Sequence, residues 1–239
     1  MNFKNSLCVA LDSSDYEWIL SAATALADHI GWFKVGLEAF SAHGPALVEE
    51  LAGIGPRVFL DLKLHDIPVT VGRAASNCAA CGASMLTVHA AGGRRMLEAA
   101  VQGARQGAKQ SPPKIVAVTV LTSLDRDALS ELEIDNTPAD LVGVWAKLAV
   151  QSGLDGVVAS AREAAALRRE FGEEFLIVAP GIRPASNATD DQRRVMTPAE
   201  AIRAGADILV VGRPITGADD LLEAAKSIVA EMASADSPV

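Results

Sequence analysis

The chain has 239 residues, of which half are hydrophobic and only 4% are aromatic. This length and content suit one large α/β domain with an aliphatic core of the kind found in parallel sheets. The formal net charge of −9 argues against nucleic acid as a partner, because a phosphate backbone needs a basic face. Three cysteines, Cys8, Cys78 and Cys81, are too few for a disulfide framework and indicate a reducing compartment. Cys78 and Cys81 have CxxC spacing without a second ligand pair, so we expect small core residues, not a metal or redox site.

The start of the chain predicts a cytoplasmic protein. The segment MNFKNSLCVALD passes almost at once into a strand-like run and has no charged leader before an apolar region, so we expect no signal peptide. No uninterrupted apolar stretch reaches the roughly 18–20 residues that a membrane-spanning helix needs. We therefore expect a soluble protein of the cytosol that has no membrane partner.

Short apolar, β-branched runs recur along the chain and predict eight strands. They lie at residues 7–12, 32–38, 57–63, 84–90, 114–122, 156–161, 175–183 and 207–215. The segments between them carry apolar residues every three or four positions, which is typical of amphipathic helices. Residues 15–30 form one such segment, for which we expect Ser13 or Ser14 as the N-cap. A later helix is expected to begin after Thr197, where a capping residue precedes a proline.

Eight alternating strand and helix units within 239 residues fit a single (β/α)8 barrel. The alternative is a doubly wound open sheet, but no GxGxxG turn follows the first strand. We predict one barrel domain over residues 1–239, with residues 233–239 as a frayed tail. Two connections after strands, 123–140 and 184–198, are long and polar. Each can be a solvated loop, and the composition of the second better fits a lid that closes on a ligand.

The segment FLDLKLHDIP, residues 59–68, places three charges at the end of a predicted buried strand. Because side chains alternate along a strand, Asp61 and Lys63 share one face and the leucines beside them share the other. We expect Asp61 and Lys63 to point into the barrel at its C-terminal rim, with Asp66 in the following turn. Two neighbouring carboxylates favour the charged ammonium form of Lys63, which suits a proton donor. The alternative is a purely structural ion pair.

Other polar residues at predicted strand ends would share this rim, where barrel enzymes place their sites. They are Asp12, Lys34, Thr122, Arg183, Gly212 and Arg213. Loops after the last two strands commonly hold a phosphate, to which Arg213 offers a bidentate fork. His89, at the end of the fourth strand, is either a base or a residue that orders the Gly-rich turn beside it, and we favour the second role.

The segment DLKLHDIP resembles the D-x-K-x-x-D-I-P signature of the orotidine 5′-phosphate decarboxylase family. The resemblance continues in order along nearly the whole chain, through ALD, KVGLE, VHAAGG, VTVLTS, PGIRP with a downstream DDQRR, and VGRPI. It implies a homodimeric (β/α)8 barrel that converts orotidine 5′-monophosphate to uridine 5′-monophosphate and CO2. This is the last step of de novo pyrimidine synthesis, and the family uses neither a metal ion nor an organic cofactor.

The same resemblance implies roles for individual residues. Lys63 would protonate C6 as CO2 leaves, with Asp61 near the departing carboxylate. Asp66 and Thr70 would reach across the dimer interface into the partner's site. The other implied substrate contacts are Asp12 and Lys34 at the ribose and charge network, Thr122 and Pro180 at the pyrimidine, Gln192 in the lid, Gly212 and Arg213 at the phosphate with Arg183 beside it, and Ile67.

Three other functions remain open from the residues alone. A sugar-phosphate decarboxylase or epimerase on a similar barrel would hold Mg²⁺ with carboxylates such as Glu38 and Asp61. A Schiff-base aldolase would need the neutral amine of Lys63, which its carboxylate neighbours disfavour. A non-catalytic barrel that binds nucleotide phosphates would have no use for the intact Asp61–Lys63–Asp66 set.

Overall fold

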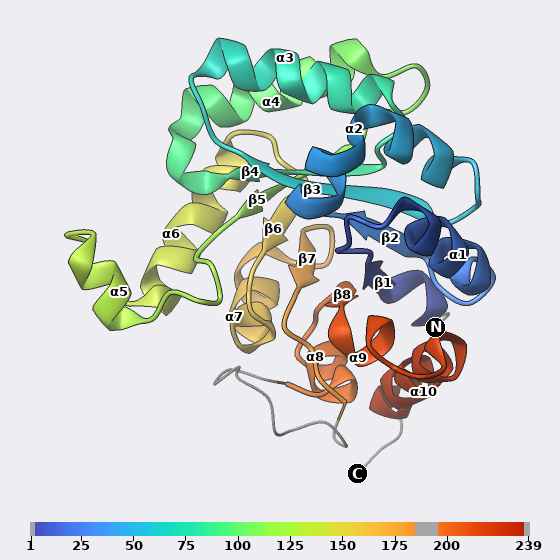
Figure 1. Ribbon diagram of the computed structural model, residues 1–239. Helices are drawn as coiled ribbons and strands as arrows, with labels where there is room; N and C mark the ends of the chain where they lie inside the picture. Colours follow the sequence, from blue (N-terminus) through green and yellow to red (C-terminus); the bar gives the residue numbers. More distant parts are fainter. Residues whose placement is uncertain (1–2, 185–195, 237–239) are drawn as a thin grey trace.

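The protein folds as a closed barrel of eight parallel strands surrounded by helices, as seen in a computed structural model that describes residues 3–184 and 196–236 (Figure 1). The strands pair in chain order and the last pairs with the first, so the predicted (β/α)8 barrel is confirmed over the open sheet. The strands are β1 Leu7–Ala10, β2 Trp32–Val35, β3 Arg57–Leu64, β4 Met85–His89, β5 Lys114–Val118, β6 Gly156–Val158, β7 Leu176–Ala179 and β8 Ile208–Val211.

The helices follow the strands in the expected alternation. They are α1 Tyr16–Leu26, α2 Leu37–Ala52, α3 Pro68–Ala80, α4 Gly93–Gly107, α5 Arg126–Glu131, α6 Pro138–Gln151, α7 Ala161–Phe171, α8 Pro198–Arg203, α9 Arg213–Thr216 and α10 Leu221–Ala233, with 3-10 turns η1 Phe3–Ser6, η2 Ala90–Gly92 and η4 Ser234–Asp236. Residues 237–239 of the expected tail lie outside the described residues. No helix in the described ranges is long and apolar enough to cross a membrane.

Two caps show how local sequence sets helix starts. The N-cap of α1 is Asp15, whose carboxylate accepts a hydrogen bond from the Trp18 N–H at 3.0 Å, so the expected serine cap is wrong. Ser13 instead accepts from the Asp15 N–H at 3.0 Å and supports the cap from outside the helix. The predicted start of α8 after Thr197 is confirmed, and Glu200 completes a capping box there.

The polar connection after β5 contains a helix of its own. Within residues 123–140, α5 begins at Arg126 with Asp125 as its N-cap, and this helix projects from the barrel (Figure 1). The chain then returns along the barrel as α6. The connection is therefore an elaborated βα loop at the C-terminal end of β5.

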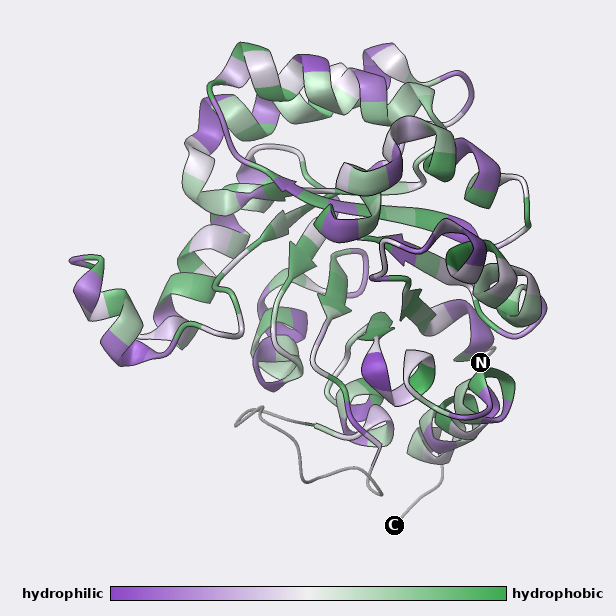
Figure 2. Ribbon diagram, viewed as in Figure 1, coloured by the Kyte–Doolittle hydropathy of each residue, from purple (hydrophilic) through white to green (hydrophobic). Residues whose placement is uncertain are grey.

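The core has two apolar layers because strand side chains alternate between the inside and the outside of the barrel. In Figure 2 the strands are mostly hydrophobic, whereas hydrophobic and hydrophilic residues alternate along the helices. The outer layer packs leucines, isoleucines, valines and alanines of the strands against the helices. The inner layer fills the barrel with Cys8, Ala10, Trp32, Phe59, Met85, Val116, Val178, Ile208 and Val210. The barrel is thus plugged by side chains, and polar groups concentrate at its mouth.

Helices α3 and α4 form a tightly packed pair over one side of the barrel (Figure 1). A Cβ atom on Gly103 would lie 1.9 Å from the backbone oxygen of Gly72, and one on Gly107 would lie 2.0 Å from that of Ser76. Only glycine permits this approach. Helix α3 begins at Pro68, with Ile67 as its N-cap, two residues after Asp66.

Candidate functional site

The carboxyl end of β3 carries a backbone irregularity that places the central charges. The pairing register between β3 and β4 shifts between Leu60 and Leu64, and Lys63 adopts a left-handed φ of 51°. A non-glycine residue with positive φ is uncommon, and such strain concentrates at functional sites. Here it presents the Lys63 side chain at the mouth of the barrel.

Two lysines and two carboxylates form a connected charge cluster at this mouth. Lys63 Nζ lies 2.7 Å from Asp61 Oδ2, and Lys34 Nζ lies 3.8 Å from the same oxygen. Lys34 also binds Asp12 Oδ1 at 2.8 Å. Asp61 and Lys34 are each only 8% exposed, whereas the side chain of Lys63 is 33% exposed. The cluster therefore has buried inner members and a lysine that an incoming ligand can reach.

Gly36 leaves the space that the cluster needs. It is the N-cap of α2, and a Cβ atom there would lie 2.6 Å from Asp12 Oδ1 and 2.9 Å from Lys34 Nζ. The expected inward face of Lys34 is confirmed, because this residue lines the cavity at the mouth. Glu38, considered above as a metal ligand, lies in the exposed first turn of α2.

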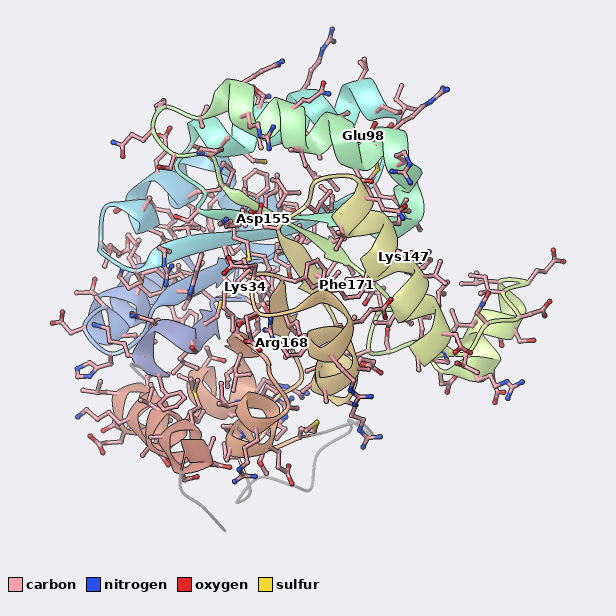
Figure 3. All side chains as sticks on the ribbon, turned by 180° about the vertical axis from the view of Figure 1, so that it is seen from behind. Lys34, Glu98, Lys147, Asp155, Arg168 and Phe171 are labelled. Carbon is pink, nitrogen blue, oxygen red and sulfur yellow. The ribbon has the colours of Figure 1, made fainter. Side chains whose placement is uncertain are left out.

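A cavity of about 220 Å³ opens beside the cluster. Five of the residues predicted for the site line it together: Lys34, Asp61, Lys63, Thr122 and Pro180. Its remaining walls are Phe59, Val118, Val120, Leu121, Val158, Ala159 and Val210. The labelled Lys34 lies among the strands at the centre of the molecule, whereas the labelled Lys147 belongs to the outer helix α6 (Figure 3). The cavity is apolar with charges on one side, a combination that suits a small ligand with an apolar body and a polar or charged substituent.

Asp66 and Thr70, which are expected to serve the partner's site, and Ile67, an expected substrate contact, lie on the outside of this chain. Asp66, Ile67 and Thr70 are exposed around the start of α3, and Asp66 Oδ1 accepts from the Ile67 N–H at 2.6 Å. Lys63 forms its ion pair with Asp61 and none with Asp66 within the chain. The expectation that Lys63 lies between two carboxylates is therefore met by only one carboxylate of its own chain.

The residues expected around a phosphate are spread over the ends of β7 and β8. Arg183 is 8% exposed, and its Nη1 donates to the carbonyl of Ile182 at 3.3 Å. Gly212 is the N-cap of α9 and Arg213, the first residue of this helix, is exposed. Gln192 and the middle of the expected lid lie outside the described residues.

His89 orders the turn that follows β4, as we favoured. Its Nδ1 accepts from the Ala91 N–H at 3.3 Å, and its ring stacks on His65 at 5.2 Å and meets the edge of Trp145 at 5.9 Å. Burial, followed by the nearby His65 and Lys63, lowers the pKa of His89. The lowered pKa favours the neutral imidazole, whose Nδ1 accepts the hydrogen bond of the turn.

Thr87 is a member of the site that the sequence did not single out. Its fully buried hydroxyl lies between Asp61 and the backbone of Lys63. The sequence feature that could indicate Thr87 is its position in β4: it alternates with Met85 and His89 and so shares their inward face, where a polar residue is unusual. Threonine is also a common strand residue, so this signal is weak.

The described residues offer little for metal binding. Within ranges 3–184 and 196–236, no three His, Cys, Asp or Glu side chains gather closely enough to hold a metal ion. Cys78 and Cys81 are buried core residues as expected, and burial raises the pKa of Cys78 to about 12. Mg²⁺ can be held by one or two carboxylates together with a substrate, so a chelator experiment remains the direct test.

Fold and site together define a (β/α)8 barrel with a lysine–carboxylate centre at the carboxyl ends of its strands, the position of barrel active sites. A family model described as Orotidine 5′-phosphate decarboxylase / HUMPS family matches residues 5–228, and the chain belongs to this family.

Individual relatives agree with this assignment. A protein of Moorella thermoacetica named orotidine 5′-phosphate decarboxylase is 52% identical over 236 residues, covering 97% of this chain and 94% of the relative. One of the same name from Anaeromyxobacter sp. (strain K) is 51% identical, covering 94% of this chain and 96% of the relative. A crystal structure of orotidine 5′-phosphate decarboxylase from Lactobacillus acidophilus matches with a TM-score of 0.83 at 40% identity, covering 95% of this chain and 98% of that one.

Proposed function

We propose that this protein decarboxylates orotidine 5′-monophosphate to uridine 5′-monophosphate without a metal ion or organic cofactor, and that Lys63 is the proton donor. Family membership and the names of the relatives support the reaction. The observation that carries the role of Lys63 is its position, with Nζ 2.7 Å from the buried Asp61 and its side chain lining the apolar cavity.

The main requirement of the proposed reaction is a fixed positive charge beside C6. As the bond from C6 to the carboxylate breaks, CO2 departs and the electron pair stays on C6. The Lys63 ammonium stabilises this pair and then transfers a proton to C6, leaving a neutral amine that regains its proton from water. Prearranged charges in a site with little water can supply this stabilisation because they need no reorganisation during the reaction. Asp61 holds Lys63 in place and faces the departing carboxylate.

The distal parts of the substrate supply binding energy. In the proposed complex, Asp12 and Lys34 bind the ribose, Thr122 and Pro180 contact the pyrimidine, and Gly212 and Arg213 bind the phosphate. Arg183 lies beside the phosphate, and Gln192 reaches it from the connection after β7. Interactions remote from the reacting carbon can organise the charges around it.

A second chain completes the site in this proposal. Asp66, Ile67 and Thr70 are exposed at the start of α3, and Ile67 and Val69 are 65% and 61% exposed despite being apolar. An exposed apolar pair beside a carboxylate suits contact with another copy of the chain. The partner's Asp66 would then be the second carboxylate beside Lys63.

The direct experiment is a decarboxylation assay on orotidine 5′-monophosphate in the presence of EDTA. Full activity is expected, and loss of activity that added Mg²⁺ restores would refute the proposal that the reaction needs no metal ion. Lys63→Ala should nearly abolish turnover while largely keeping affinity for uridine 5′-monophosphate. Lys147→Ala, which removes an exposed lysine of α6, is the matched control and should behave as the parent. Retained turnover in Lys63→Ala would refute Lys63 as the proton donor.

A further inference from the structure

Thr87 makes two hydrogen bonds that join the central acid to the strained backbone beside it. The Lys63 N–H donates to Thr87 Oγ1 at 2.8 Å, and Thr87 Oγ1 donates to Asp61 Oδ1 at 3.0 Å. The threonine comes from β4, so the two bonds cross the point where the β3–β4 register shifts. Its side chain is fully buried.

The direction of both bonds is fixed by chemistry. A backbone N–H can only donate, so the hydroxyl oxygen must accept from Lys63. The single hydroxyl proton is then free to point to Asp61 Oδ1, which as a carboxylate oxygen only accepts. Asp61 Oδ2 is thereby left to face the ammonium groups of Lys63 at 2.7 Å and Lys34 at 3.8 Å. One hydroxyl sets which carboxylate oxygen meets the lysines.

The same hydroxyl supports the unusual backbone at Lys63. The φ of 51° and the shifted register take the Lys63 N–H out of the regular ladder, and Thr87 supplies its acceptor. A buried N–H left without an acceptor would be costly. The conformation that aims Lys63 at the cavity therefore depends on this side chain.

We infer that Thr87 is a positioning residue for the proposed decarboxylation: its buried hydroxyl fixes the Asp61 carboxylate and the Lys63 backbone in the arrangement that presents the ammonium to C6. This inference rests on the proposed function for its kinetic consequence. Its geometric consequence, the orientation of Asp61 and Lys63, does not depend on the reaction.

The test compares Thr87→Val, which keeps the shape of the side chain but loses the hydroxyl, with Thr87→Ser, which keeps the hydroxyl. Thr119→Val is the matched control, because Thr119 is equally buried and its Oγ1 donates to the Val158 carbonyl at 2.8 Å without contacting the charge cluster. If the valine variant does not fold, Thr87→Cys serves in its place, since a thiol is similar in size but a weak hydrogen-bonding group.

We expect kcat of Thr87→Val to fall about 10- to 100-fold, as when a supporting bond is lost or a reacting group moves by about 1 Å. Affinity for uridine 5′-monophosphate should stay near the parental value, Thr87→Ser should recover most of the kcat, and Thr119→Val should match the parent. Crystal structures should show Asp61 rotated or Lys63 displaced in the valine variant and unchanged in the serine variant.

Parental kcat in Thr87→Val, or equal losses in the valine and serine variants, would overturn the inference. A parent chain that does not act on orotidine 5′-monophosphate would instead refute the proposed function. In that case the crystal structures decide the role of Thr87, and an unmoved Asp61–Lys63 pair in the valine variant would reject it.

Discussion

At the residue scale, Gly36 shows how one missing side chain shapes the site. An added Cβ would meet Asp12 Oδ1 at 2.6 Å and Lys34 Nζ at 2.9 Å, and both atoms are the far ends of flexible side chains. These ends can move without unfolding the protein, but they would leave their places in the charge cluster. The damage should therefore fall on function and spare stability.

We predict that Gly36→Ala lowers kcat/KM by about 10- to 100-fold, the effect expected when a binding group is displaced by about 1 Å. The midpoint of urea unfolding should change little. Gly143→Ala is the control: Gly143 lies within α6 with no heavy atom within 4 Å of the added Cβ. That variant should gain about 0.5–1 kcal/mol of stability and keep the parental kcat/KM. Unchanged kcat/KM in Gly36→Ala would contradict this account of the cluster.

The sequence predicts the inward charges but not how they are held. Alternation along a strand predicts that Asp61 and Lys63 point into the barrel, and both line the cavity. The positive φ of Lys63 and the bond to Thr87 depend on the neighbouring strand β4, which is distant in sequence. Pairings of this kind arise from tertiary structure, so no local pattern indicates them.

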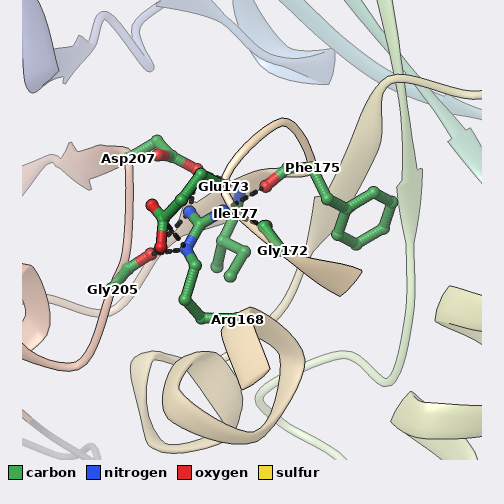
Figure 4. A network of polar contacts seen from close by, with 7 residues as sticks. All are labelled: Arg168, Gly172, Glu173, Phe175, Ile177, Gly205 and Asp207. Carbon is green, nitrogen blue, oxygen red and sulfur yellow. Dashed lines mark hydrogen bonds and ion pairs between the residues drawn. The ribbon is translucent and has the colours of Figure 1, made fainter. Parts of the chain in front are cut away.

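At the element scale, a polar clamp at the opposite end of the barrel joins α7 to the starts of β7 and β8 (Figure 4). Arg168 of α7 donates to the carbonyls of Gly172 at 2.7 Å, Phe175 at 2.9 Å and Gly205 at 2.8 Å. Its Nη2 also binds Asp207 Oδ2 at 2.6 Å, and the same oxygen accepts from the Ile177 N–H at 2.7 Å. Arg168 and Asp207 thus provide hydrogen-bond partners for backbone groups between α7 and β7, in β7 and just before β8.

We predict that Asp207→Ala destabilises the protein by about 2–4 kcal/mol, because it leaves a largely buried guanidinium and a backbone N–H without their acceptor. Urea unfolding measures this loss. Affinity of the folded variant for uridine 5′-monophosphate should be parental, because the clamp lies at the amino ends of the strands. Glu173→Ala is the control: Glu173 is 88% exposed and lies 3.7 Å from Arg168, so removing it should cost about 0–1 kcal/mol. Equal losses in the two variants would refute the clamp.

The start of a helix can be predicted where one capping residue stands out and cannot be predicted where several capping residues are adjacent. Thr197 followed by proline and Glu200 marks α8 without ambiguity. At α1, three potential capping residues stand in a row, and the structure uses Asp15 with Ser13 supporting it. No periodic pattern predicts α5, because a helix of 6 residues is too short to show one.

At the scale of the whole molecule, the number of strands read from the sequence is sufficient to predict the fold. Eight β-branched runs separated by amphipathic segments leave few closed topologies, since parallel strands need helical crossovers of one hand. The number of strands does not predict the quaternary structure. Asp66 lies on the outer surface of its own chain, and Lys63 has one carboxylate neighbour where the proposed reaction uses two.

Lys63 therefore needs a second carboxylate from outside its own chain in the proposed site. Mixing two inactive variants tests whether a partner chain supplies it. In a dimer of Lys63→Ala and Asp66→Ala chains, one site has lost both groups, whereas the other pairs an intact Lys63 with an intact Asp66 of the partner. Random exchange should restore about one quarter of the parental activity, because half of the dimers are hybrids and each has one complete site. Activity is measured after exchange has been verified with differently tagged chains.

Mixing Lys63→Ala with Asp61→Ala is the matched control, because these two residues belong to the same chain's half of the site. Each site of that hybrid lacks one of the two groups, so no activity should return. Recovery only in the first mixture would place Asp66 in the partner's site. If the first mixture stays inactive despite verified exchange, each chain must work alone, and the second carboxylate beside Lys63 would have to come from its own chain.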